Sequence, residues 1–289
     1  MHTSNEPQFA DLPTTPKPII CEFCGAERYT QGFDLLGRIM WCPSGAMPCT
    51  CEDGRADFER KQAEIKAKRE AEEQQKADFE HRQRVQRNIG ESGLGARFMR
   101  RTFDTFVGET QSDRRIKTMA VDYCENFEMM LPKRNQPLPE RNGFFFFGSK
   151  GTGKTHISAA IANALLEKGK AVICMTERNI FDKIRKTYCE YGGDELAVRV
   201  TFERVPLLII DDLGKEKPSE WTLSTLYAIV DGRYENALPT IVTTNYNFDE
   251  LVKKLTPPKS DTTTAEAVLD RLQEMCQVIE MTGESWRSR

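Results

Sequence analysis

The fold of this chain is decided by one run of residues, Gly148-Ser149-Lys150-Gly151-Thr152-Gly153-Lys154-Thr155. The run fits the pattern G-x-x-x-x-G-K-[ST], in which glycines let the backbone curl around phosphate groups. An apolar stretch at 144–147 predicts a strand before it, and residues 156–166 predict a helix after it. We therefore expect all eight residues to bind ATP, with Lys154 on the β- and γ-phosphates and the Thr155 hydroxyl on Mg²⁺.

A second motif supplies carboxylates. The stretch 207–212 has four apolar residues followed by Asp211 and Asp212. A strand places Asp211 at its tip, where we expect it to hold Mg²⁺ through water, and Asp212 is placed to polarise the attacking water. The alternative is a pair of acids that merely ends a strand in a turn. Asn245 follows the next apolar stretch, and we expect its amide to orient that water or to contact the γ-phosphate.

The remaining pattern indicates the fold class. Apolar stretches predict strands separated by amphipathic helices, at 143–147, 171–175, 207–210, 241–244 and 278–281. Strands this apolar are buried on both faces. The sequence therefore predicts an α/β fold, with a parallel sheet between two layers of helices.

Composition excludes several classes of protein. The 289 residues are 39% hydrophobic and carry a net charge of −3, so any contact with nucleic acid has to come from a local basic patch. No apolar stretch reaches the length of a membrane span, and the N-terminus does not have the order of a signal peptide. We expect a cytoplasmic protein without a membrane partner.

The motifs occur in an order that resembles a known family. The phosphate loop is followed by IIDDLG at 209–214, IVTTN at 241–245, LDRLQEM at 269–275 and MTGESWRSR at 281–289. This order resembles AAA+ ATPases of the DnaC/DnaI type, a group of helicase loaders that includes the closely similar IstB transposition helpers. The resemblance covers about residues 92–289 and includes a lead-in segment at 94–106.

The resemblance implies roles for three further residues. Asn245 matches the sensor-1 residue, Arg271 the arginine finger, and Arg287 the sensor-2 arginine. A finger acts in a neighbouring subunit's site, so the resemblance implies self-association in ATP. The alternative for Arg271 and Arg287 is that each is an ordinary surface arginine. Because the sequence stops at Arg289, we expect no sizeable C-terminal lid.

The family also carries a helical insertion, which residues 177–204 match. Basic residues interleaved with aromatic residues suit single-stranded DNA, since cations bind phosphates and aromatic rings stack on nucleobases. An ordinary solvated helix explains the same residues. The expected DNA contacts are Arg178, Lys183, Arg185, Lys186, Tyr188 and Tyr191.

Five of the nine cysteines fall between residues 21 and 51, which favours a metal site. Cys21-x-x-Cys24 is half of a zinc site, and the other half has to come from three further cysteines, Cys42, Cys49 and Cys51. The sequence 48–51 resembles the closing pair of several loaders, which favours Cys49 and Cys51 with Cys42 as a substitute. An iron–sulfur cluster or free thiols are the alternatives. The scattered cysteines are expected in the core: Cys124, Cys174, Cys189 and Cys276.

These features divide the chain into four parts. We predict a flexible leader at 1–17, a zinc-binding module at 18–54, a charged linker helix at 55–89 and an AAA+ ATPase domain at 90–289. Residues 57–87 contain no glycine or proline and are rich in helix formers. The linker helix is either fully solvated or docks on a partner through three apolar residues, Phe58, Ile65 and Phe79.

The resemblance implies a function as well. It implies an ATPase that loads a replicative DNA helicase, binding single-stranded DNA and gripping the helicase with its N-terminal module. Hydrolysis would drive release. Two alternatives stay open, a transposition helper ATPase and a non-catalytic adaptor that binds ATP as a switch. The cofactors expected are ATP, Mg²⁺ and Zn²⁺.

Overall fold

The computed structural model of the protein describes residues 16–35, 38–108, 110–134, 137, 140–187, 194–283 and 285–286. The chain forms two compact units, residues 1–79 and 80–289. The division falls inside the predicted linker helix. The division of the chain into four parts therefore stays a prediction.

The N-terminal unit consists of two antiparallel hairpins and the first part of a long helix. Strand β1 (Ile19–Ile20) pairs with β2 (Glu27–Arg28), and β3 (Thr30–Leu35) pairs with β4 (Arg38–Ala46). Helix α1 then covers Glu52–Glu91, beyond the predicted 55–89 at both ends. Its first turn carries Glu52 and Asp53, whose charges suit the positive end of a helix. Of its apolar residues, Ile65 and Phe79 are 48% and 55% exposed.

The second unit contains the predicted parallel sheet. Its strands are β5 (Gly143–Phe147), β6 (Val172–Thr176), β7 (Leu207–Asp211), β8 (Thr240–Thr243) and β9 (Cys276–Glu280). They lie in the order β6-β7-β8-β5-β9, and each neighbouring pair is parallel. The α/β fold predicted from the apolar stretches is confirmed.

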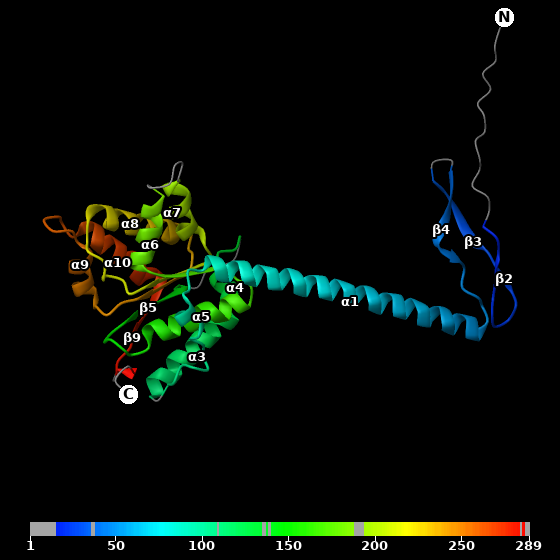
Figure 1. The fold of residues 1–289 in the computed structure, drawn as a ribbon, viewed down its shortest axis with the longest axis horizontal. Coiled ribbons are helices and arrows are strands. Elements are labelled where there is room, and N and C mark those ends of the chain that lie inside the picture. Colours follow the sequence, from blue (N-terminus) through cyan, green and yellow to red (C-terminus); the bar gives the residue numbers. More distant parts are fainter. Residues whose placement is uncertain are drawn as a thin grey trace, which may run out of the picture. The chain divides into compact units, whose positions relative to one another are not determined.

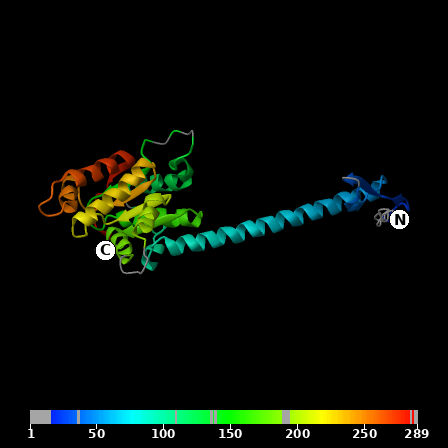
Figure 2. The ribbon, with the colours of Figure 1, turned by 90° about the horizontal axis from the view of Figure 1, so that it is seen from above.

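Helices cover both faces of this sheet (Figure 1). Helices α3 and α5 pack on one face, and α6 to α10 pack on the other, where α8 and α10 lie side by side (Figure 2). The bounds of the helices are α2 Ala96–Met99, α3 Gln111–Glu125, α4 Phe127–Met130, α5 Lys154–Glu167, α6 Glu177–Lys186, α7 Glu195–Arg204, α8 Glu220–Glu235, α9 Phe248–Leu255 and α10 Thr263–Met275.

Alternate residues of each strand enter opposite cores, as the pleat requires. Phe144 and Phe146 of β5 pack with α3 and α5, whereas Phe145 packs with the opposite layer. Strand β7 divides in the same way. The predicted core cysteines Cys124, Cys174 and Cys276 are buried, and Cys189 lies outside the described residues.

A buried arginine joins three elements of the second unit. Arg233 of α8 has no exposed surface. Its guanidinium donates to the carbonyl oxygens of Phe202 and Val205, at 2.8 and 2.9 Å, which end helix α7. It also donates to the Pro239 carbonyl at 2.5 Å and to the Thr240 hydroxyl at 2.9 Å, at the start of β8. One side chain thus closes the helix end and fixes it to the sheet.

We expect Arg233→Met to lower the free energy of unfolding by at least about 3 kcal/mol, because several buried carbonyls lose a charged donor. Arg199→Met is the matched control. Arg199 is partly exposed on α7 and pairs with Glu203 at 3.0 Å, so its loss should cost less than about 1 kcal/mol. Chemical unfolding of both variants measures the difference, and equal midpoints would contradict the role given to Arg233.

Candidate functional site

The phosphate-loop run connects β5 to α5, as predicted. Gly148, at φ +130°, lies so close to the Met281 carbonyl that a Cβ atom would collide with it. Gly153 caps α5 in the left-handed region, at φ +95°. Both positions therefore require glycine. The loop has the tight curl that turns backbone N–H groups and a helix N-terminus toward an anion.

Lys154 is the first residue of α5 and is 5% exposed. Its ammonium donates to the Gly148 and Ser149 carbonyls at 2.8 and 2.6 Å and to the Thr152 hydroxyl at 3.3 Å. The positive charge therefore lies inside the curl of the loop. A cationic group at this place fits the phosphate role expected for Lys154.

Asp211 ends β7 beside the loop and is 3% exposed. Burial raises the pKa of its carboxyl, and the Thr243 and Thr155 side chains act in the opposite direction by hydrogen bonding to it. The Thr155 side chain thus lies near Asp211. A carboxylate beside a hydroxyl is the hard oxygen donor set that Mg²⁺ prefers, so the residues fit the cation.

Thr243 is a site residue that the sequence analysis did not single out. It ends β8 and is fully buried. Its hydroxyl donates to Asp211 Oδ1 at 2.7 Å and accepts the Asp212 N–H at 2.9 Å. Asp212 has a left-handed backbone, at φ +62°, and its carboxylate pairs with Lys215 at 2.5 Å. One hydroxyl therefore holds both acidic residues, and its only sequence signal was a polar residue at a strand end.

The loop and Asp212 open onto a cavity of about 270 Å³. Lys154, Thr155, Asp212 and Asn245 line it together. The opposite wall comes from the predicted lead-in segment and its continuation, including Arg101 and Thr105–Val107. The structure thus brings the predicted phosphate, magnesium and sensor-1 residues to one place.

His156 fixes that wall to the loop. Its Nε2 lies 3.1 Å from both the Thr105 hydroxyl and the Thr102 carbonyl, and its ring meets Phe106 edge-on at 5.5 Å. Burial lowers the pKa of its imidazole. The residue directly after the phosphate loop therefore holds the lead-in segment against α5, which the sequence analysis did not anticipate.

Comparison with known proteins gives this site a family. Residues 139–289, which include the phosphate loop and both acidic residues, match the family described as IstB-like ATP binding protein. The chain belongs to that family. A curated relative, the replicative helicase loader DnaC of Escherichia coli (strain K12), is 29% identical over 190 residues, which cover 66% of this chain and 70% of the relative.

Solved structures show the same architecture. The crystal structure of the DnaC helicase loader, 25% identical, superposes with a TM-score of 0.53 and covers 65% of this chain and all of that one. The crystal structure of DnaI, 22% identical, gives a TM-score of 0.51 over 66% of this chain and 93% of its own. The predicted AAA+ core and the resemblance to the DnaC type are confirmed. Family membership supports ATP binding and, in general terms, ATPase activity.

The predicted arginine finger lies elsewhere on this IstB-like domain. Arg271 of α10 pairs with Asp231 at 2.6 Å, donates to the Tyr227 hydroxyl at 3.0 Å and lies over the Tyr227 and Tyr234 rings. It is not among the described residues that line the cavity. Its role therefore stays a prediction.

The predicted sensor-2 residue, Arg287, lies outside the described residues. The segment just before it does reach the nucleotide cavity. The Trp286 N–H donates to the Gly151 carbonyl at 3.1 Å, and Trp286 lines the cavity.

The predicted DNA-contacting bases lie on α6. Arg178 and Arg185 each lie 3.6 Å from Asp182, and Arg185 also covers the Trp221 ring at 4.7 Å. Lys183 and Lys186 line an open groove on the same helix. Tyr188 and Tyr191 lie outside the described residues. Helix α6 thus presents basic side chains, two of which pair with Asp182. The contact with DNA stays a prediction.

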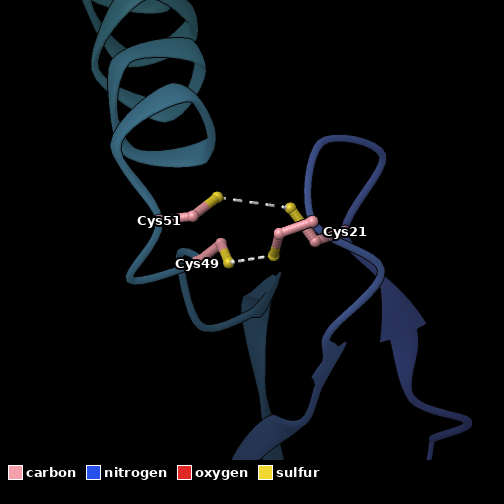
Figure 3. A group of neighbouring side chains, drawn as sticks. Cys21, Cys49 and Cys51 are labelled. Carbon is pink, nitrogen blue, oxygen red and sulfur yellow. Dashed lines mark hydrogen bonds between the residues drawn. The ribbon is translucent and has the colours of Figure 1, made fainter.

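The cysteine cluster forms in the N-terminal unit, outside the residues matched to the IstB-like family. Cys21, Cys24, Cys49 and Cys51 bring their four sulfurs within 4.8 Å of one another. Cys21 faces Cys51 at 3.8 Å, and Cys49 faces Cys24 at 3.4 Å (Figure 3). Sulfurs bound to one tetrahedral zinc ion at about 2.3 Å are roughly 3.8 Å apart, so the cluster fits zinc.

The local backbone and the neighbouring thiols shift the pKa values of the cysteines in this cluster. N–H groups of Phe23 and Cys24 lower the pKa of the Cys21 thiol to about 6, whereas contact with the Cys49 thiol raises that of Cys51 to about 12. A bound cation offsets such crowding of thiolates. Cys42 lies in β4, but its side chain is outside the described residues. The four favoured cysteines are brought together, and zinc itself stays a proposal.

No helix in the described part of the chain combines the length and apolar character needed to cross a membrane.

We expect Thr243→Val to raise the Mg²⁺ concentration needed for half-maximal ATP binding by about 10- to 100-fold, because Asp211 loses the donor that orients it. Thr243→Ser keeps the hydroxyl and should behave like the wild type. Titration of Mg²⁺ against binding of a fluorescent ATP analogue measures the effect. Equal Mg²⁺ dependence in both variants would show that the hydroxyl does not orient the carboxylate.

The cysteine cluster predicts the metal content of the purified protein. We expect about one zinc ion per chain, lost in Cys49→Ser and retained in Cys42→Ser, since four thiolates complete the site. Elemental analysis of the reduced proteins measures this. Zinc lost only in Cys42→Ser would contradict the ligand set, and iron in its place would select the cluster alternative.

Proposed function

We propose that this protein is an AAA+ ATPase that loads a replicative DNA helicase. The observation that carries the proposal is the meeting of the phosphate loop with Asp212 at one cavity, with Asp211 bound to Thr243 beside it. The chain is also similar over two-thirds of its length to a helicase loader. An ATP-driven cycle gives such a protein a bound and a released state.

The chemistry is phosphoryl transfer to water. Lys154 stabilises negative charge on the phosphates, and Thr155 and Asp211 hold Mg²⁺, which neutralises charge on the phosphate oxygens when bound. Asp212 polarises the water, and Asn245, on the same cavity, orients it. The Thr243 hydroxyl supports both acidic residues, because it donates to the Asp211 carboxylate and accepts the backbone N–H of Asp212.

We assign the trans role to Arg271. A finger from a neighbouring subunit completes the site only when subunits assemble, so hydrolysis is slow in the isolated chain. The contact of Arg271 with Asp231 and two tyrosine rings supports this, because it holds the guanidinium in one direction without involving the cavity of its own chain. Arg287 is proposed as the sensor-2 arginine on the strength of the resemblance.

Two surfaces are proposed for macromolecules. Helix α6 contacts single-stranded DNA through four basic side chains, because cations on an exposed helix attract phosphates. They are Arg178, Lys183, Arg185 and Lys186. The N-terminal unit binds the helicase. Its support is a set of apolar side chains left exposed around the cysteine cluster, including Ile20 at 63%, Phe23 at 53% and Tyr29 at 58%. Exposed apolar groups of this kind mark interaction sites.

A transposition helper is the second function kept, because the matching family is described as IstB-like ATP binding protein. Such a helper uses the same ATPase core on duplex DNA. A non-catalytic adaptor is opposed by the acidic pair and its Thr243 support. Asp212→Asn should retain nucleotide binding and lose turnover, which an adaptor would not show.

Co-elution with the replicative helicase of the host tests the loader. We expect a complex between the full chain and the helicase that is retained in Lys154→Ala and lost when residues 18–54 are removed. Gel filtration with and without ATP measures it. The truncated chain has to bind the ATP analogue normally, which shows that its second unit is folded.

The result that would overturn the loader is the absence of a complex in every nucleotide state. If the same preparation coats duplex DNA in ATP, the transposition helper replaces it. Loss of the complex only in Lys154→Ala would place the helicase contact on the ATPase unit instead of the N-terminal unit.

A further inference from the structure

A buried carboxylate lies outside the set of groups that the proposed chemistry uses. Glu177 is the first residue of α6, directly after β6, and is 4% exposed. Its Oε2 accepts the N–H of Gly214 at 2.9 Å and that of Glu216 at 3.3 Å. Burial raises the pKa of this carboxyl, and the backbone N–H groups counteract that effect. Among the described residues, this buried acid is held by the backbone of one loop, and such an arrangement calls for a role.

The loop it holds is the one that carries Asp212. This loop leaves β7 with Asp212 at φ +62° and continues to Lys215, whose ammonium pairs with the Asp212 carboxylate at 2.5 Å. From the β8 side, the Thr243 hydroxyl binds the Asp212 N–H. From the α6 side, Glu177 binds the N–H groups on either side of Lys215. The direction of the Asp212 carboxylate thus depends on contacts from two elements.

Helix α6 has its other end at the proposed DNA surface. The helix is ten residues long, and its last turn carries Lys183, Arg185 and Lys186. These bases border an open groove of about 690 Å³, which also touches Gly93 and Met175. Ile180, Phe181 and Ile184 of the same helix are buried in the core. A short helix packed in this way moves as one body, so a displacement at its basic end reaches Glu177.

Helix dipole compensation does not account for these contacts. An acid in the first turn is favourable because it faces the helix N-terminus, and Glu220 of α8 occupies the corresponding first position while exposed. The carboxylate of Glu177 instead reaches across to another segment. Glu177 and Glu220 are therefore a matched pair of residues with the same place in a helix and different contacts.

We propose that Glu177 is a positioning residue that links α6 to the loop of Asp212, so that an anionic polymer bound to the bases of α6 controls hydrolysis through it. The proposal rests on the proposed function, because it assigns regulation of the same site. Among the described residues, Glu177 is not part of the nucleotide cavity lining. It acts by fixing the geometry of the loop.

The test compares the wild type with Glu177→Ala, Glu177→Gln and the control Glu220→Ala. Steady-state hydrolysis of Mg-ATP is measured with and without an oligo-dT strand of about 20 nucleotides. In Glu177→Ala we expect kcat to fall by about 10- to 100-fold with KM nearly unchanged, and the response to oligo-dT to disappear. Glu177→Gln keeps an acceptor oxygen and should recover most of the activity, and Glu220→Ala should match the wild type.

Hydrogen exchange of the 212–218 segment gives a readout that does not depend on turnover. Oligo-dT should change exchange at Gly214 and Glu216 in the wild type and in Glu220→Ala, and should leave it unchanged in Glu177→Ala. If the wild type binds ATP without hydrolysing it, the proposed function fails, and this exchange still tests the link.

Three results would overturn the proposal. One is an unchanged kcat in Glu177→Ala, and another is a response of its 212–218 segment to oligo-dT equal to that of the wild type. The third is a parallel loss of nucleotide affinity and thermal stability in both Glu177 variants, because that pattern describes a residue needed only for folding.

Discussion

The parallel register of three central strands is the constraint on which the site depends. Phe146 of β5 pairs with Thr243 of β8, and Ile210 of β7 pairs with Val242, so the three strands end at one edge of the sheet. The phosphate loop, the acidic pair and the Thr243 hydroxyl follow from those strand ends. A slip of one residue in β8 would turn the side chain of Thr243 to the other face. The Asp211 carboxylate would then lose its donor, and the Asp212 N–H its acceptor.

The sequence predicted the parts of this arrangement that depend on strong local signals. Apolar stretches located the five strands, and the glycine pattern located the loop that brings Lys154 and Thr155 to Asp211. Local signals do not contain long-range hydrogen bonds. Thr243 and Glu177 were not foreseen as support for the acidic residues, because each acts across the sheet edge on a segment more than 30 positions away. Only the fold shows such pairs.

Helix α3 was not predicted from the sequence, for a different reason. Its buried residues Ile116, Ala120, Tyr123 and Cys124 recur at helical spacing, so periodicity in the sequence contains the signal. The cysteine ligand set, in contrast, could not be settled by spacing. Cys42 and Cys49 are both compatible with a zinc site in sequence, whereas the structure shows the Cys49 sulfur beside that of Cys24.

Asp212 shows how easily this site can change in evolution. Its left-handed backbone at φ +62° is a conformation that asparagine and aspartate adopt more readily than other residues with a side chain. Asparagine would keep this backbone and the N–H bond to Thr243 while removing the charge. A single nucleotide change in an aspartate codon makes that replacement. With Asp212 in its proposed role, that one change would turn a site that hydrolyses ATP into one that only binds it, and the sheet edge would stay as it is.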